Sequence, residues 1–388
     1  MNLSLDYGAI EGSHELKKGI LSLYQSGDDE EIAICHGGVN ANELVLMTLL
    51  STNDHILSFL PTYQQLYSFP ESLGVEVDFI HLKEENELAF KFSDYIMFSP
   101  FGMLLIENSI KSLRKKYSQV KFSIKVNKES RSITYAAHMG FFKAISENIN
   151  FGKLPGEALG NDNYIPISRI HFKNYRSNYL FSKISPLKYI EYEARNLAKV
   201  LAQKNEELEK LFTYLIREII RNSQEHGLTD MAWVCAQNWK SRSTAEIAIL
   251  DNGIGYKESL IRKYKKFVIN DETAMRIALE PGVTESYVSK YAQEEENSGF
   301  GLFVASEICD ALDGSFSILS GNTLLKKHKG TFSIMEAFHE GSIIKMSINT
   351  SKNFCFEELI ANIVTDGEKM IRQNKKASEL SKGKFLIS

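Results

Sequence analysis

Three polar side chains recur every four residues in the stretch REIIRNSQEHG, residues 217–227: a carboxylate at Glu218, an amide at Asn222 and an imidazole at His226. Four-residue spacing advances a helix by one turn plus about 40°, so the three side chains would form a slanting ridge on one face. A ridge of this kind can contact a single ligand. A solvated helix face would produce the same spacing, so the ridge alone leaves both interpretations open.

Two glycine-containing motifs follow this ridge in the chain. The strand-like run AEIAIL leads into DNGIG, so that Asp251 ends a strand and Gly253 and Gly255 allow a tight turn and a close approach to a ligand. Further along, Gly299 and Gly301 precede an apolar helical pattern, where free backbone N–H groups can bind phosphate. Taken singly, each motif is also compatible with an ordinary turn or helix start.

The composition describes an ordinary globular chain. Its 388 residues exceed the size of one usual core and predict two or three domains. A net charge of -4 gives no electrostatic reason to expect nucleic-acid binding. The sequence shows neither a signal-peptide pattern nor an apolar run long enough to span a membrane, and its four cysteines lack metal-ligand or disulfide-framework spacing. We therefore expect a cytoplasmic protein.

Changes in hydrophobic pattern predict four segments, with an α/β fold class throughout. Residues 1–90 alternate helical and strand-like runs, 91–180 form a second small α/β module, 186–350 carry the motifs, and 351–388 form a terminal helix and polar tail or a partner contact. In the motif-bearing segment, two long helices precede mostly adjacent strands, among them MAWVCAQNW, GSFSILSG, GTFSIMEAFH and GSIIKMSI. We expect an α+β sandwich with helices on one face of a mixed sheet.

Together and in this order, the polar ridge, the DNGIG strand end and the GFGL helix start resemble the N, G1 and G2 boxes of the GHKL superfamily of histidine-kinase-like ATPases. The resemblance covers about residues 205–350 and implies an ATP site containing Mg²⁺. It implies that Asp251 accepts a hydrogen bond from the adenine amino group and that Gly253 and Gly255 pass beneath the base.

The same resemblance assigns roles around the phosphates. Asn222 would coordinate Mg²⁺, a hard cation suited by an oxygen ligand, and Glu218 would orient or deprotonate the attacking water or hydroxyl. Gly299, Gly301 and Leu302 would form the phosphate-facing turn. His226 matches the extended box, and as a lone histidine it favours a structural role.

The polar segment between the glycine boxes resembles the mobile ATP lid of this superfamily. Its basic cluster, residues 262–266, is compatible with phosphate or partner contact and equally with a solvated face. The helical stretch upstream of the N box contains no histidine, which disfavours an autophosphorylating histidine kinase.

Two weaker resemblances concern the segments upstream. Residues 91–180 resemble a STAS-like module, with a plain structural domain as the alternative. Residues 1–90 look like the front of a class I/II pyridoxal-phosphate aminotransferase, which would place Gly37, Gly38 and Val39 at a phosphate-binding turn and Tyr63 on the pyridine ring. No match follows for the Schiff-base lysine, so we expect a truncated remnant that does not use pyridoxal phosphate.

The sequence thus predicts a protein that binds Mg·ATP and acts as an ATPase or an anti-sigma-like protein-kinase switch. The alternatives are a nucleotide-dependent binding module without turnover and an aminotransferase-related enzyme. The expected partners are ATP and a protein or phosphoacceptor, with a homodimer also possible and neither membrane nor nucleic acid expected.

Overall fold

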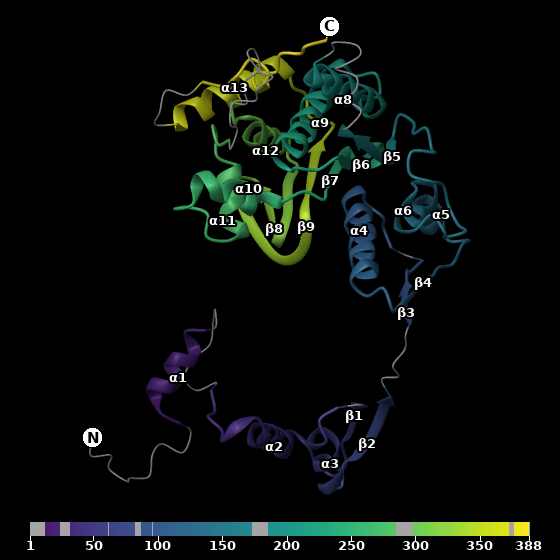
Figure 1. The fold of residues 1–388 in the computed structure, drawn as a ribbon, viewed down its shortest axis with the longest axis vertical. Coiled ribbons are helices and arrows are strands. Elements are labelled where there is room, and N and C mark those ends of the chain that lie inside the picture. Colours follow the sequence, from purple (N-terminus) through teal and green to yellow (C-terminus); the bar gives the residue numbers. More distant parts are fainter. Residues whose placement is uncertain are drawn as a thin grey trace. The chain divides into compact units, whose positions relative to one another are not determined.

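The computed structural model describes residues 12–23, 32–60, 62–81, 87–94, 96–172, 185–284, 298–371 and 376–387. The chain divides into two compact units, Met1–Leu88 and Ala89–Ser388, each described here by itself (Figure 1). The boundary predicted near residue 90 falls close to this division. The boundaries predicted near 180 and 350 fall inside the second unit, so the finer division into segments stays a prediction.

The first unit contains one parallel strand pair joined by a helix. Its elements are α1 (His14–Leu21), α2 (Gly37–Leu49), β1 (His55–Leu60), α3 (Gln65–Ser72) and β2 (Glu76–His81). Strands β1 and β2 are parallel and pair from His55 with Glu76 onward, which is the βαβ arrangement that the alternating pattern predicts. The apolar run EIAIC at 31–35 is also strand-like in pattern, yet residues 32–35 carry no strand. A short apolar run does not reveal whether a neighbouring strand is there to pair with it.

The second unit is built on a five-stranded sheet in the order β5-β6-β7-β9-β8. The strands are β5 (Tyr164–His171), β6 (Met231–Trp239), β7 (Thr244–Asp251), β8 (Ser315–His328) and β9 (Thr331–Asn349), and every neighbouring pair is antiparallel. The expectation of a mixed sheet is therefore wrong. A short connection with a 3-10 helix at Lys240–Arg242 joins β6 to β7, and another short connection joins β8 to β9. Such short connections reverse the chain direction and therefore join antiparallel strands.

Strand β9 is one long element where the sequence predicted two, GTFSIMEAFH and GSIIKMSI. The interruption in the pattern is Gly341, which has a φ of +95° within the strand. The partner strand shifts register between Ser320 and Gly321, beside this point. The glycine therefore marks an irregularity in a continuous strand, and pattern alone does not distinguish that from a strand end.

One face of the sheet is covered by helices that include the motif-bearing α9 and α12. Helices α8 (Pro186–Ala202), α9 (Glu206–His226) and α12 (Gly301–Ala311) contact the strands, α10 (Gly255–Tyr264) and α11 (Asp271–Ala278) lie beside β8, and α13 (Phe356–Met370) packs on α9 and α12 (Figure 1). Helix α9 begins at the N-cap Asn205, whose side chain accepts from Leu208 N. Its apolar positions, Leu211, Leu215 and Ile219 among them, are buried in the core against the sheet.

The opposite face of the sheet is covered too, by elements from the upstream part of the unit. Helices α4 (Pro100–Lys116), α5 (Arg131–His138) and α6 (Phe141–Ile145) share a core with β6, β7 and β9, and β3 (Glu87–Lys91) pairs with β4 (Lys121–Lys125). The expectation of helices on one face is therefore wrong, because sheet residues such as Trp233, Cys235 and Leu250 point away from α9 and pack with Met103 and Leu104 of α4.

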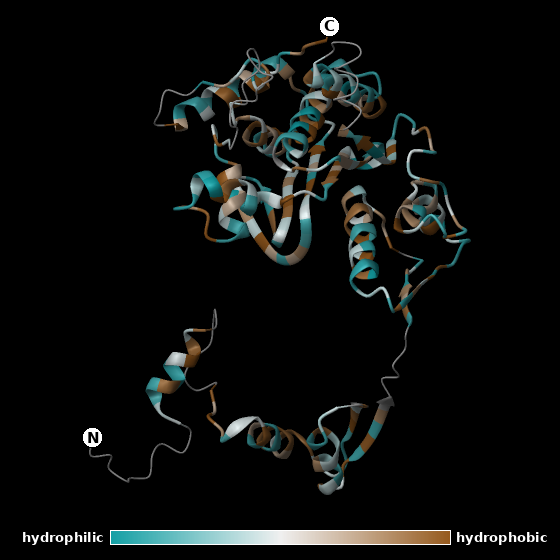
Figure 2. Ribbon diagram, in the orientation of Figure 1, coloured by the Kyte–Doolittle hydropathy of each residue, from teal (hydrophilic) through white to brown (hydrophobic). Residues whose placement is uncertain are grey.

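The apolar run DYIMFS, residues 94–99, is strand-like in pattern, yet residues 96–99 carry no strand, and β3 precedes them. Figure 2 shows hydrophobic and hydrophilic segments alternating along α4 and α9, as expected for helices with one buried face. Among the described residues, no helix combines the length and the apolarity needed to cross a membrane.

Candidate functional site

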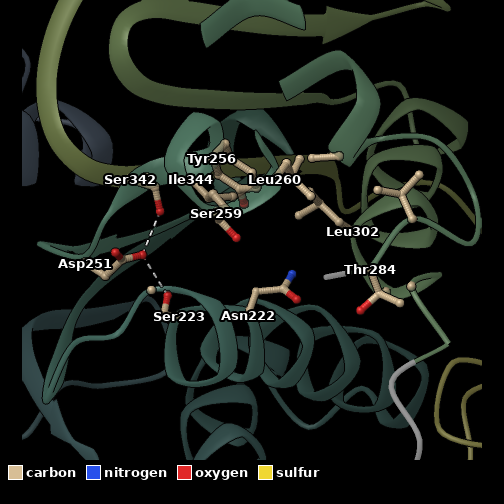
Figure 3. A pocket seen from close by; sticks show the side chains of 16 residues that line it. Asn222, Ser223, Asp251, Tyr256, Ser259, Leu260, Thr284, Leu302, Ser342 and Ile344 are labelled. Carbon is tan, nitrogen blue, oxygen red and sulfur yellow. Dashed lines mark hydrogen bonds between the residues drawn. The ribbon is translucent and has the colours of Figure 1, made fainter. Parts of the chain in front are cut away.

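A cavity lies where the C-terminal half of α9, the end of β7, helices α10 and α11 and the start of α12 meet. It encloses about 690 Å³ of empty space, part of which is open to solvent. Figure 3 shows Asp251, Ser223 and Ser342 together at one end of this cavity and the apolar side chains Leu260 and Leu302 along its wall. An apolar cleft with a few convergent polar groups is the usual form of a small-molecule site.

Asp251 is the polar anchor of this cavity and is only 4% exposed. Its Oδ2 accepts hydrogen bonds from the hydroxyls of Ser223, at 2.9 Å, and Ser342, at 2.6 Å, while Oδ1 accepts from Gly253 N at 2.9 Å. Burial raises the pKa of Asp251, and these three hydrogen bonds oppose that rise. Because a carboxylate offers about four acceptor positions, one position remains, and it is on Oδ1.

The turn after Asp251 is packed so closely that glycine is needed at Gly253. A Cβ added there would lie 2.0 Å from the carbonyl oxygen of Gly227, at the end of α9. The next amide, Ile254 N, donates to that same carbonyl at 3.0 Å. These contacts fix the strand end against the helix end, which sets the separation between Asp251 and Asn222 across the cavity.

Asn222 extends from α9 into the cavity, as Figure 3 shows. Within the part of the chain that the structure describes, its amide has no hydrogen-bond partner. Mg²⁺ prefers oxygen ligands and is usually bound by one or two protein oxygens together with phosphate oxygens and water. The side-chain oxygen of Asn222 can serve as such a ligand, so the residue is compatible with the metal role that the resemblance implies. The side chain of His226, at the last position of α9, lies outside the described residues.

Glu218 lies one helical turn before Asn222 and outside the described cavity lining. Its side chain is buried and its Oε1 accepts from both Nε and Nη2 of Arg217, at 3.2 Å and 3.0 Å. Its Oε2 lies against Gly301, where an added Cβ would come within 2.1 Å of it. Since Gly301 lines the cavity, Glu218 lies against a lining residue.

The other residues of the predicted phosphate turn do reach the cavity. Gly299, Gly301 and Leu302 line it, and Gly299 has a φ of +75° that glycine adopts without strain. Gly255 lines it as well, whereas Gly253 borders a second cavity on the other side of the same turn. The structure thus brings Asn222, Asp251, Gly255, Gly299, Gly301 and Leu302 together around one space.

Several cavity residues were not predicted as site residues. Ser223 and Ser342 hold the Asp251 carboxylate, and Tyr256, Ser259, Val283 and Thr284 are among the other lining residues. Ser342 is positioned because it pairs directly with Asp251 across β7 and β9. The sequence offered a signal for this residue, the Gly-Ser in place of the Gly-Thr often found in the resembled family, but it offered none for Ser223. Of the basic cluster at 262–266, Lys263 donates to the Thr284 carbonyl at the cavity edge.

A histidine approaches Asp251 from the other face of the sheet. His339 is 3% exposed, with Nδ1 3.2 Å from Asn108 Nδ2 of α4 and Nε2 3.4 Å from the Asp251 carbonyl oxygen. The amide nitrogen of Asn108 can only donate and the Asp251 carbonyl can only accept, so the ring is neutral with its proton on Nε2. Burial lowers the pKa of His339 to about 4, which agrees with a neutral ring.

The comparison with protein families favours a ligand site over a solvated ridge. Residues 207–349 match the model of the histidine kinase-, DNA gyrase B-, and HSP90-like ATPase family. This segment is similar to GHKL-type ATPase domains. The resemblance stated for about 205–350 is confirmed, and the match supports ATP binding. The matched segment contains both ends of the cavity, from Asn222 on α9 to Ser342 on β9.

The N-terminal resemblance is confirmed as well, since residues 2–97 match the model of aminotransferase class I and II. Within this part, Gly37 begins α2, but its N–H donates to the Cys35 carbonyl, and Tyr63 is 57% exposed. The Gly37 N–H is thus already paired within its own turn, and we derive no chemistry through pyridoxal phosphate. No curated protein and no solved structure matches the chain.

Proposed function

We propose that the chain binds Mg·ATP in the cavity of the GHKL domain and hydrolyses it slowly or transfers its γ-phosphate to a partner. The observation that carries the proposal is the buried Asp251, whose remaining acceptor position on Oδ1 lies at the polar end of an apolar cleft. An exocyclic amino group is a donor that suits this acceptor, and the apolar wall suits a purine ring.

At the opposite end of the cavity, Asn222 and the glycine turn face the space where phosphates would extend. The start of α12 presents backbone N–H groups, which favour an anion. Mg²⁺, when bound, neutralises charge on the phosphate oxygens. Asn222 would hold that ion through its Oδ1, and Leu302 would close the apolar side.

Glu218 is the general base in this proposal. A water oxygen attacks the γ-phosphorus, the bond from that phosphorus to the β,γ-bridging oxygen breaks, and its electron pair leaves with ADP. The water proton passes to the Glu218 carboxylate. A base needs one oxygen within reach of the water, and Oε2, behind Gly301, is the oxygen that Arg217 does not occupy.

A second function, a nucleotide-dependent binding module without turnover, is favoured by one observation. Glu218 is buried, pairs with Arg217 and does not line the described cavity, so nucleotide can bind here without contacting a base. In that case ATP would act by repositioning the lid, the polar segment between the glycine boxes, and altering a partner surface. A protein partner, a phosphoacceptor and a homodimer remain predictions from the sequence.

The test combines binding with turnover. Calorimetric titration with Mg·ATP and with a non-hydrolysable analogue measures affinity, and a phosphate-release assay compares the wild-type chain with Glu218→Ala. We expect binding in both proteins and turnover only in the wild type. Binding with no wild-type turnover would leave the binding module as the function, and absence of binding would overturn the proposal.

A further inference from the structure

The strongest unexplained feature of the second unit is the setting of Arg217. Its side chain is 2% exposed, and all five of its N–H donors are used. Two of them go to Glu218 Oε1, one goes to Glu191 Oε2 at 2.9 Å, and two go to main-chain carbonyls far along the chain. These carbonyls belong to Leu380, at 2.7 Å, and Lys384, at 2.9 Å.

The C-terminal segment, residues 376–387, supplies these carbonyls and is itself held in place. Glu191 of α8 accepts from Leu386 N and Ile387 N through Oε1, at 2.6 Å and 2.8 Å, and is fully buried. Tyr214 of α9 donates its hydroxyl to the Ser381 carbonyl at 3.1 Å. The sequence allowed this tail to be a partner contact, and the structure places it against α8 and α9 of its own chain.

The same segment also contacts the beginning of the phosphate turn. The hydroxyl of Ser298, directly before Gly299, lies 3.0 Å from that of Ser381 and 3.3 Å from that of Ser378. Ser298 is 7% exposed, so this small hydroxyl cluster is largely shielded from water. The C-terminal segment therefore contacts two elements that meet at Gly301, namely the Arg217–Glu218 pair and the residue that opens the glycine turn.

We propose that Arg217 is a positioning residue for Glu218 and that the C-terminal segment holds it in the geometry required for turnover. The proposal rests on the hydrolysis proposed above. A buried carboxylate without its cation loses several favourable interactions, and an arginine without its carbonyl partners would leave donors unsatisfied. Both changes would let Glu218 move away from Gly301, while the adenine end of the cavity at Asp251 would keep its contacts.

The experiment releases the segment without touching the site. Leu380 is 5% exposed, so Leu380→Asp places a charge at a buried position and undocks the segment. Lys382→Asp is the matched control, because it introduces the same residue two positions away at an exposed site. The Lys382 side chain forms an ion pair with Glu379 at the surface. Hydrogen–deuterium exchange over 376–387 reports undocking, phosphate release reports kcat, and titration with the non-hydrolysable analogue reports Kd.

For Leu380→Asp we expect faster exchange in the segment, a kcat lower by about tenfold or more, and a Kd within about twofold of the wild type. Lys382→Asp should leave all three quantities unchanged. Faster exchange with an unchanged or increased kcat would overturn the inference, and a parallel loss of kcat and analogue binding would show a merely structural role.

A milder variant covers the case in which Leu380→Asp fails to fold. Glu191→Gln keeps the side-chain shape but removes the charge opposite Arg217, and it should also lower kcat while preserving Kd; an unchanged kcat would refute the proposal. Failure of the proposed function gives a different pattern, because then the wild type itself would show no turnover that Glu218→Ala removes.

Discussion

The Asp251→Asn substitution tests the nucleotide site most directly, because the structure fixes how the new amide must sit. Gly253 N donates to Oδ1, so the asparagine oxygen has to occupy that position. The amide nitrogen then replaces Oδ2 and faces the hydroxyls of Ser223 and Ser342, which can rotate to accept. The fold therefore keeps its hydrogen bonds, and what changes is the charge of the acceptor.

The magnitude follows from the type of hydrogen bond that is lost. A bond to a charged group contributes about 1.5–3 kcal/mol and a bond between neutral groups about 0.5–1.5 kcal/mol. The difference, about 1–1.5 kcal/mol, corresponds to a Kd for ATP that is roughly tenfold weaker. The substitution leaves the phosphate end of the cavity at Asn222 unchanged.

The assay is calorimetric titration with two non-hydrolysable nucleotides, one carrying adenine and one carrying purine without the 6-amino group. Asp251→Asn should weaken binding of the adenine nucleotide and leave the purine nucleotide nearly unchanged. Glu246→Gln is the control, because Glu246 lies on the same strand, is buried and contacts Phe101 N and Lys345 instead of the cavity. Equal losses for both nucleotides would refute the assignment of Asp251 to the amino group.

Three further predictions concern packing and protonation. Gly301→Ala should lower turnover at least about tenfold and cost about 1–3 kcal/mol of stability, because its Cβ would displace the Glu218 carboxylate. Phosphate release measures the turnover and thermal unfolding measures the stability. A variant with wild-type turnover would contradict the packing of Glu218 against Gly301. Burial lowers the pKa of His339 to about 4 from 6.5, so the unfolded chain takes up the proton first and stability falls as pH drops from 6.5 towards 4. Between pH 7 and pH 5 the wild type should lose about 2 kcal/mol of unfolding free energy through His339, and His339→Gln should remove this loss. Urea unfolding at each pH measures it, and an unchanged dependence of the unfolding free energy on pH in the variant would contradict the prediction. Burial raises the pKa of Glu107 to about 7, against the opposing effect of Lys111, so the folded state loses stability as pH rises from 4.5 through 7. Glu107→Gln should therefore stabilise the chain by about 1–3 kcal/mol at pH 8 and by little at pH 4.5, in the same unfolding assay; equal effects at both pH values would show that burial does not set this ionisation.

Local pattern predicted the elements that carry the motifs. The apolar positions of α9, the two-helix reading of 186–226 and the strands β6 and β7 follow from periodicity, which depends on residues close in the chain. The order of the three boxes placed Asn222 and Asp251 around one cavity because helix and strand ends carry them. The roles assigned to these residues stay predictions until nucleotide binding is measured.

What the pattern could not predict are contacts between distant parts of the chain. Trp233 and Leu250 read as ordinary strand residues, and no local signal indicates that α4 will cover them. The carbonyls of Leu380 and Lys384 have no side-chain signature at all, so their bonds to Arg217 were invisible in the sequence. The continuity of β9 through Gly341 depended on pairing with β7 and β8, which is likewise non-local.

The two covered faces of the sheet bear on how this protein can be cut for experiments. The family match spans 207–349, yet β5 at one edge of the sheet, α4 on its far side and the tail that holds Arg217 all lie outside that span. A fragment trimmed to the matched residues would leave Trp233, Cys235 and Leu250 facing water, and an exposed apolar sheet surface invites aggregation. Soluble fragments should therefore begin near residue 89 and retain the C-terminus, so that the smallest usable piece is more than twice as long as the matched segment 207–349.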